Sequence, residues 1–98
     1  MNNITKVSEI TANDVATYIR LEEPDQDDMA TLNTLLGVAK QYIIDYTGQT
    51  DLDTYQDFVI VVLILCQDMW DNRTLYVDKL NLNKVVDTIL GMHSVNLL

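Results

Sequence analysis

The residues that could do chemistry in this chain are few and far apart in sequence. His93 is the only histidine and Cys66 the only cysteine, whereas nucleophilic catalysis needs a nucleophile, a base and an orienting group held together. Cys66 lies inside a nine-residue apolar run, where a thiol is usually an inert small hydrophobic group. His93 is near the C-terminal end and is expected at the surface. No enzymatic activity is predicted from these residues.

Neither a cofactor nor a metal site is predicted. The three glycines are isolated, so they form no glycine-rich loop of the kind that binds phosphate. The acidic segment Glu22–Asp28 suggests calcium, but it lacks the glycine and the glutamate that an EF-hand loop needs in register. The other interpretation is that Asp25 caps a helix while Asp27 and Asp28 favour its positive dipole end. We expect this second role.

The charge of the chain argues against a surface that grips nucleic acid. Fifteen acidic and six basic residues give a formal charge of −9, with eight acids in residues 1–49 and seven in residues 50–98. DNA-binding proteins usually concentrate Lys and Arg on one face, whereas the six bases here are scattered along the sequence. A protein that surrounds DNA without gripping it is compatible with this charge.

Length and composition predict one small domain over residues 1–98. The chain has 98 residues, 48% of them hydrophobic, and chains of this length rarely divide into two domains. Its start lacks the basic segment and apolar run of a signal peptide. The longest apolar run, nine residues, is much shorter than the roughly 18–20 residues that span a bilayer. An intracellular protein without a membrane partner is expected.

Hydrophobic periodicity and capping residues predict the first two helices. Residues 1–10 show no period and are expected to form a flexible arm. Thr11 and Asp14 have capping-box spacing for a short helix over residues 12–20. A long amphipathic helix follows Asp25, and Gly48 suits the left-handed position that ends it. Its apolar stripe consists of Met29, Leu32, Leu36, Ala39, Ile43 and Tyr46.

The third predicted element is the most apolar part of the chain. Asp53 and Gln56 have capping-box spacing, and the pattern favours a helix over residues 54–72, with a buried strand as the alternative. Three short companions could cover only part of so apolar a helix, so the rest is expected to meet another subunit. The expected core and subunit-interface residues are Val59, Val62, Leu63, Cys66, Met69 and Trp70.

The last quarter of the chain predicts a loop, a short helix and an apolar tail. Residues 74–82 lack a period, and Asn81 or Asn83 could cap a final helix that Gly91 is expected to stop. In the tail, residues 93–98, the side chains expected to dock on another protein are Val95, Leu97 and Leu98. The predicted fold class is therefore all-α: a small bundle of about four helices, two long and two short, with its helical core at residues 11–92.

Two helix endings stand out in this order of elements. The long helix ends in Tyr46-Thr47-Gly48, and the apolar helix ends in Trp70-Asp71-Asn72-Arg73. Together with the acidic turn before the long helix and the total size, they make residues 10–92 resemble the small head–tail connector (adaptor or head-completion) proteins of long-tailed bacteriophages. The segment Thr74–Lys84 departs from that family, because it lacks the Gly- or Ala-rich loop and the helix-opening proline of many members.

The resemblance implies an all-helical structural subunit without enzymatic activity. Members of the family form rings of about a dozen subunits beneath the portal protein, extend the channel for genomic DNA, and provide a platform for the next stopper protein. It thus implies three protein partners: further copies of the chain, the portal and the stopper. DNA would only pass through the channel. The implied location is the neck of the virion, with the host cytoplasm during assembly.

A second function class is an acidic inhibitor that mimics DNA, or another small helical protein-binding inhibitor. A third class, a small helical enzyme subunit or regulatory protein, has no feature in the sequence to support it. A mimic needs its carboxylates on one continuous surface, whereas scattered carboxylates favour the connector. The acids whose positions discriminate are Asp14, Asp25, Asp27, Asp28, Asp45 and Asp68.

Overall fold

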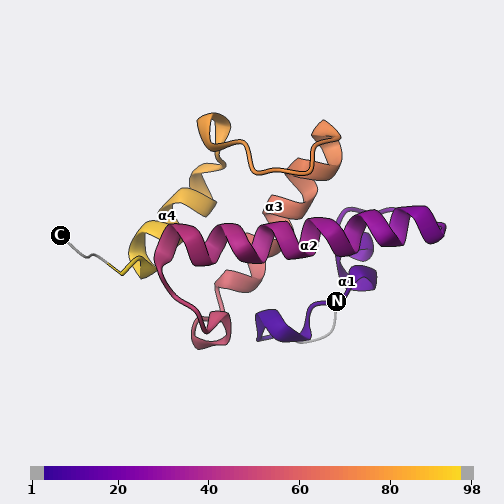
Figure 1. Ribbon diagram of the computed structural model, residues 1–98. Coiled ribbons are helices and arrows are strands. Elements are labelled where there is room, and N and C mark those ends of the chain that lie inside the picture. The colour runs from indigo at the N-terminus through magenta and orange to yellow at the C-terminus, as the bar shows by residue number, and fades with distance from the viewer. Residues whose placement is uncertain (1–3, 96–98) are drawn as a thin grey trace.

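Within residues 4–95, four α-helices carry the fold; one single-turn 3₁₀ helix precedes them and two lie between them (Figure 1). The computed structural model describes residues 4–95, and no β-strand forms among them. The elements in chain order are η1 (Val7–Glu9), α1 (Ala12–Tyr18), α2 (Gln26–Thr47), η2 (Leu52–Thr54), α3 (Phe58–Asn72), η3 (Lys79–Asn81) and α4 (Lys84–His93). The predicted all-α class is confirmed, and the strand alternative for the apolar run is wrong.

Capping side chains fix where three of the helices begin. The Thr11 side chain accepts from the Asp14 N–H, while the Asp14 carboxylate accepts from the Thr11 N–H at 2.8 Å. Asp25 and Asp28 make the same reciprocal pair before α2. At α4, the cap is Asn83, whose side chain accepts the N–H two residues further on at 2.8 Å. Each cap satisfies helix N–H groups that otherwise lack a partner.

Besides these three predicted starts, two predicted helix ends are confirmed, and three other boundaries are wrong. Gly48 ends α2 in the left-handed region with φ +75°, as expected, and α3 ends at Asn72. However, α1 ends two residues before the predicted Arg20. Gly91 does not stop α4, which continues to His93. The start of α3 lies at Phe58, four residues later than predicted.

The late start of α3 has a long-range cause. The Asp53 carboxylate does not cap α3; it accepts hydrogen bonds from the N–H and the hydroxyl of Ser8, at 2.9 and 2.7 Å. These bonds lower the pKa of Asp53 below its usual value. Residues 52–54 form η2 instead of the first turn of α3. Asp53 thereby ties η2 to the η1 segment near the start of the chain.

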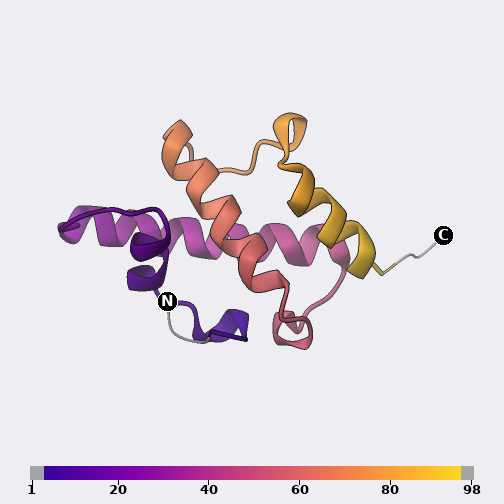
Figure 2. The same cartoon turned by 180° about the vertical axis from the view of Figure 1, so that it is seen from behind.

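The core is centred on α3, which packs against α1, α2, α4 and η1 (Figures 1 and 2). Val7 and Ile10 are buried in this core, so the expectation of a flexible arm is wrong for residues 7–10. They cover apolar surface that the four helices alone would leave open. The α3 side chains buried in the core are Phe58, Val59, Val61, Val62, Leu63, Leu65, Cys66 and Met69.

None of the helices within residues 4–95 is both long enough and apolar enough to cross a membrane.

Candidate functional site

The residues expected at a subunit interface on α3 lie inside this chain's own core. Five of the six, namely Val59, Val62, Leu63, Cys66 and Met69, are at most 7% exposed. Their burial agrees with the core part of the prediction, whereas the part that assigned them to a contact with a second subunit is wrong for these five. The physical reason is that η1, α1, α2 and α4 together surround α3 more completely than three short helices would.

Trp70, the sixth residue, lies at the edge of the core and is partly exposed. The guanidinium of Arg73 stands 4.9 Å from the centre of its ring, within the range of a cation–π interaction. Arg73 adopts a left-handed backbone conformation with φ +54°, and the following N–H, of Thr74, bonds to the Met69 carbonyl at 3.0 Å. The Trp70–Arg73 motif thus closes α3 and starts the next segment.

Of the three expected tail residues, only Val95 is described, because Leu97 and Leu98 lie outside residues 4–95. The Val95 N–H donates to the carbonyl of Thr47 at 2.6 Å. The Ser94 hydroxyl donates to the carbonyl of Tyr46, and the Gln49 side chain donates to the carbonyl of His93. The end of α4 is therefore fastened to the end of α2, while the Val95 side chain stays exposed.

His93 is not a free surface residue, contrary to the prediction. Its ring stacks on Tyr55 with a centroid distance of 3.8 Å and meets Phe58 edge-on. Its Nε2 lies 2.9 Å from Oδ2 of Asp57, the residue before α3. The imidazole therefore joins the last turn of α4 to the first turn of α3. Its position near a helix C-terminus also suits a positive charge.

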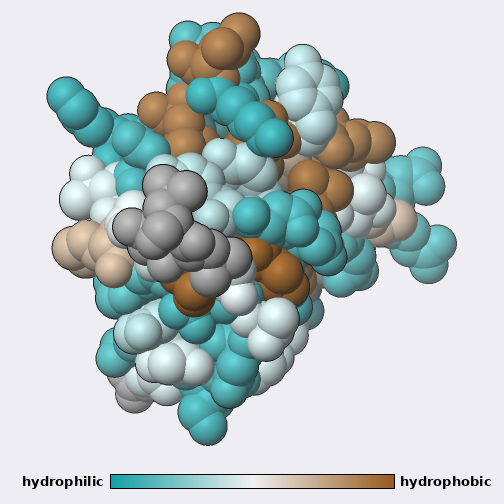
Figure 3. All heavy atoms as spheres, turned by 60° about the vertical axis from the view of Figure 1, so that its left-hand side comes forward, coloured by the Kyte–Doolittle hydropathy of each residue, from teal (hydrophilic) through white to brown (hydrophobic). Residues whose placement is uncertain are grey.

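Four of the five most exposed large apolar side chains among residues 4–95 lie on or just after the connection between α3 and α4; the fifth is Met92 of α4. We call residues 73–84 the 73–84 segment. Leu80 is 95% exposed, and Leu75, Tyr76 and the following Val85 are each more than half exposed. Figure 3 shows apolar side chains at the surface at the top of the molecule, over this connection. Hydrophobic periodicity does not reveal this surface, because a loop has no regular period. The feature of the sequence that could have revealed it is the presence of several large apolar residues in a segment without periodicity.

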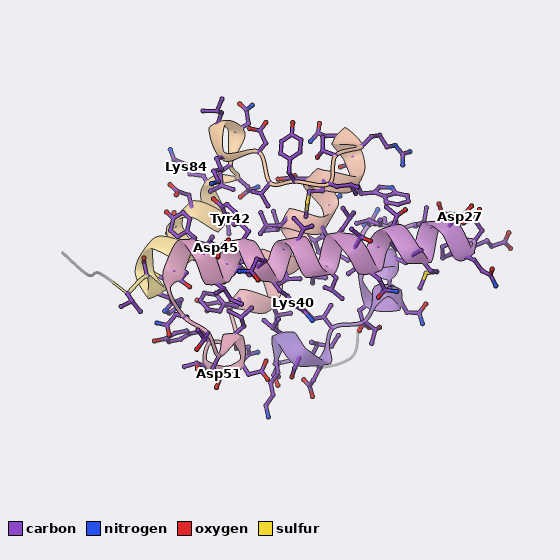
Figure 4. All side chains as sticks on the ribbon, viewed as in Figure 1. Asp27, Lys40, Tyr42, Asp45, Asp51 and Lys84 are labelled. Atoms are coloured by element: carbon purple, nitrogen blue, oxygen red, sulfur yellow. The ribbon has the colours of Figure 1, made fainter. Side chains whose placement is uncertain are left out.

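A groove of about 920 Å³ lies beside the 73–84 segment, and we call it the α2–α4 groove. Tyr42 and Asp45 of α2 and Lys84 at the start of α4 stand around it (Figure 4). The Tyr46 hydroxyl crosses one end and donates to the Asp87 carboxylate at 2.9 Å. This hydrogen bond, together with burial and the charge of Asp87, raises the pKa of Tyr46 above its usual value. The bond joins α2 to α4 across this end of the groove.

A second hollow, of about 650 Å³, lies at the N-terminal end of α3, and we call it the η2 hollow. Its walls include the side chains of Ile4, Tyr55, Asp57, Ile60, Leu63 and His93. Ile60 is the most exposed apolar residue of α3, at 36%. The hollow combines an apolar floor with a carboxylate at its edge.

Both hollows are lined by apolar and charged side chains, and the η2 hollow also contains the His93–Asp57 pair. Within residues 4–95, no three His, Cys, Asp or Glu side chains lie together in a way that could hold a metal ion. Burial raises the pKa of the Cys66 thiol to about 12, so the thiolate that would act as a nucleophile is absent near neutral pH. What this arrangement can do is bind apolar and charged side chains of another protein.

Comparison of the chain with family models, with curated proteins and with solved structures found no match in any of the three.

Proposed function

We propose that this protein is a structural subunit of a phage head–tail connector: it assembles as a ring beneath the portal, extends the DNA channel and supports the next stopper protein. The observation that carries the proposal is the exposed apolar surface of the 73–84 segment, centred on Leu80. Exposed apolar patches on a small protein with a well-filled core usually mark a protein–protein interface. The function is therefore assembly rather than catalysis.

The arrangement of helices supports the same proposal. A short capped helix, an acidic turn, a long helix, an apolar helix and a small last helix follow one another in the order that the resemblance implies. Both quoted helix endings close their helices through left-handed residues, Gly48 and Arg73. These motifs therefore have a structural role at the positions where the resemblance places them.

The positions of the acids favour the connector over a DNA mimic. Asp27 and Asp45 lie at opposite ends of α2 (Figure 4), about 27 Å apart at the rise of an α-helix. Asp14 lies in the first turn of α1. Asp68 is on α3, where burial, and then the negative charge of Asp71, raise its pKa. Such scatter does not reproduce the continuous row of charges that a mimic needs.

The net charge of −9 suits a channel that DNA must traverse, because a negative wall repels the phosphates and does not hold them. In this proposal DNA touches the ring only in passage.

The apolar tail completes the proposal as the contact with the portal. Val95 leaves the end of α4 with an exposed side chain, and Leu97 and Leu98 follow it in sequence. A chain that lacks residues 96–98 keeps every hydrogen bond described above, so we expect it to fold and yet to bind the portal more weakly. Equal binding by the truncated chain would remove the tail from the proposal.

The experiment that tests the function is the mass in solution, by light scattering, of the protein alone and then mixed with a portal protein from the same source. A ring-sized species, alone or only on the portal, is the expected result. A monomer that ignores the portal would overturn the connector proposal and favour another helical binding module.

A further inference from the structure

The charge of this protein is divided very unevenly along the chain. The 73–84 segment contains three basic residues, Arg73, Lys79 and Lys84, and one acid, a net charge of +2. All other residues together contain three bases and fourteen acids, a net charge of −11. This basic stretch also contains three of the four most exposed large apolar side chains among residues 4–95, namely Leu75, Tyr76 and Leu80. It fits a partner surface that is apolar and negatively charged.

The η2 hollow on the same chain has both of these properties. Its floor is apolar, with Ile60 exposed. One acid, Asp57, lines the hollow. The adjoining turns of η1 and η2 carry Glu9, Asp51 and Asp53, and the charges of Lys6 and Lys40 act on Asp53. None of these four carboxylates is within ion-pair distance of a Lys or Arg among residues 4–95. The hollow is therefore complementary in charge to the 73–84 segment.

The two surfaces lie on opposite edges of the molecule. In Figures 1 and 2, which are related by a half-turn about the vertical axis, the 73–84 segment runs along the upper edge and η1 and η2 lie at the lower edge. They cannot meet within one chain. When two different patches of one protein fit each other across copies, the contact is head-to-tail, and it continues into a ring or an open filament.

We propose that the 73–84 segment of one copy docks on the η2 hollow of the next copy, with Leu80 against the hollow that contains Ile60. This inference rests on the proposed function, because it names the two faces through which the ring closes. The residues outside the 73–84 segment carry a net charge of −11, so contacts between those surfaces of two copies are repulsive. Contacts that include the basic 73–84 segment are therefore favoured. The contact weakens as salt is added, because screening acts on exposed charges.

Cysteine cross-linking tests this contact directly. Leu80→Cys protein is mixed with Ile60→Cys protein under mild oxidation, and the products are separated without reductant. A disulfide needs the two Cα atoms within about 7 Å, and buried Cys66 does not compete. We expect the mixed Leu80–Ile60 dimer as the main product, and a ladder of larger species from the double variant. If Leu80→Cys links mainly to itself, a two-fold contact replaces the proposed one.

Asn33→Cys is the matched control, because Asn33 is exposed on α2 outside both surfaces; its mixture with Ile60→Cys should yield little dimer. Leu80→Ser should keep the fold and weaken assembly about tenfold or more, the usual effect of losing a central apolar anchor. The same cross-linking is repeated with the portal present. Portal-bound rings without the Leu80–Ile60 link would overturn this contact and leave the connector function standing. A Leu80–Ile60 link without portal binding would support the contact and overturn the connector function. If neither the link nor portal binding is found, the contact and the function are both overturned.

Discussion

The imidazole of His93 is the most highly connected side chain near the end of the described chain. It combines a stack on Tyr55, an edge contact with Phe58 and a hydrogen bond to Asp57. We expect His93→Ala to lower the free energy of unfolding by about 1–3 kcal/mol, since it removes an aromatic contact and a partly buried hydrogen bond. Urea unfolding at neutral pH measures this loss.

His93→Phe is the matched control, because a phenyl ring can keep the stack while losing the bond to Asp57. Its cost should fall between that of the wild type and that of the alanine variant. Equal stability of all three proteins would show that the last turn of α4 does not depend on this residue. Sequence reasoning placed His93 at the surface because it lies near the C-terminal end of the chain.

The thiol of Cys66 permits a prediction with a chemical readout. Its side chain is fully buried, and burial raises its pKa to about 12, above the usual value of about 8.5. The neutral thiol is thus favoured by folding, and this contribution is present below the unfolded pKa and decreases as pH rises above it. A thiol reagent such as Ellman's reagent should therefore react with native protein at pH 8 only as fast as the protein opens, and at once in urea.

The exposed thiol of Leu80→Cys supplies the positive control for that reaction. One fast and one slow equivalent are expected from this variant, and a fast reaction of the wild type would contradict the buried position of Cys66.

At the scale of elements, local signals were readable from sequence and long-range ones were not. The caps at Thr11 and Asp25, and the left-handed end at Gly48, depend on neighbours within four residues. Asp53 looked like a cap by spacing, but its carboxylate is bound by Ser8, 45 positions away. The burial of α3 depends in the same way on η1 and α4, which no periodicity within α3 records. The exposed surface of the 73–84 segment is known only once its neighbours are placed.

Two glycines, one inside α2 and one at its C-terminal end, should respond in opposite ways to replacement by alanine. Gly48 has φ +75°, and an added Cβ would lie 3.4 Å from the Val95 side chain, so Gly48→Ala should destabilise the fold by about 1 kcal/mol. Gly37 lies within α2 in open space, so Gly37→Ala should stabilise it by about 0.5–1 kcal/mol. Thermal unfolding of the two variants beside the wild type measures both, and shifts of the same sign would contradict the assigned helix end.

At the scale of the whole molecule, charge repulsion is largely uncompensated. Among residues 4–95, the His93–Asp57 pair is the only contact between oppositely ionisable side chains within 4.0 Å, while the chain carries a net charge of −9. Added salt screens repulsion between exposed carboxylates. We expect the urea midpoint of the monomer to rise between about 10 and 150 mM sodium chloride, because the Debye length shortens over this range from about 30 to about 8 Å.

This response has the opposite sign to the one expected for the contact between copies, which salt weakens. Measurements at several protein concentrations separate the two effects, because only association depends on concentration. A urea midpoint that falls with salt at low concentration would show that attractive pairs outweigh the repulsion.

The fastening of α4 to the end of α2 has a consequence for how the chain folds as it is synthesised. The bonds from Ser94, Val95 and Gln49 join residues that are 44 to 48 positions apart. When α3 emerges from the ribosome, α4 is still inside the exit tunnel and cannot pack, so the most apolar helix of the protein has one side uncovered. Folding proceeds from the N-terminus during synthesis, and exposed apolar surface at that stage invites aggregation. Chains that stop before residue 84 would thus lack the helix that covers α3. Their exposed apolar surface would make them targets for chaperones and proteases.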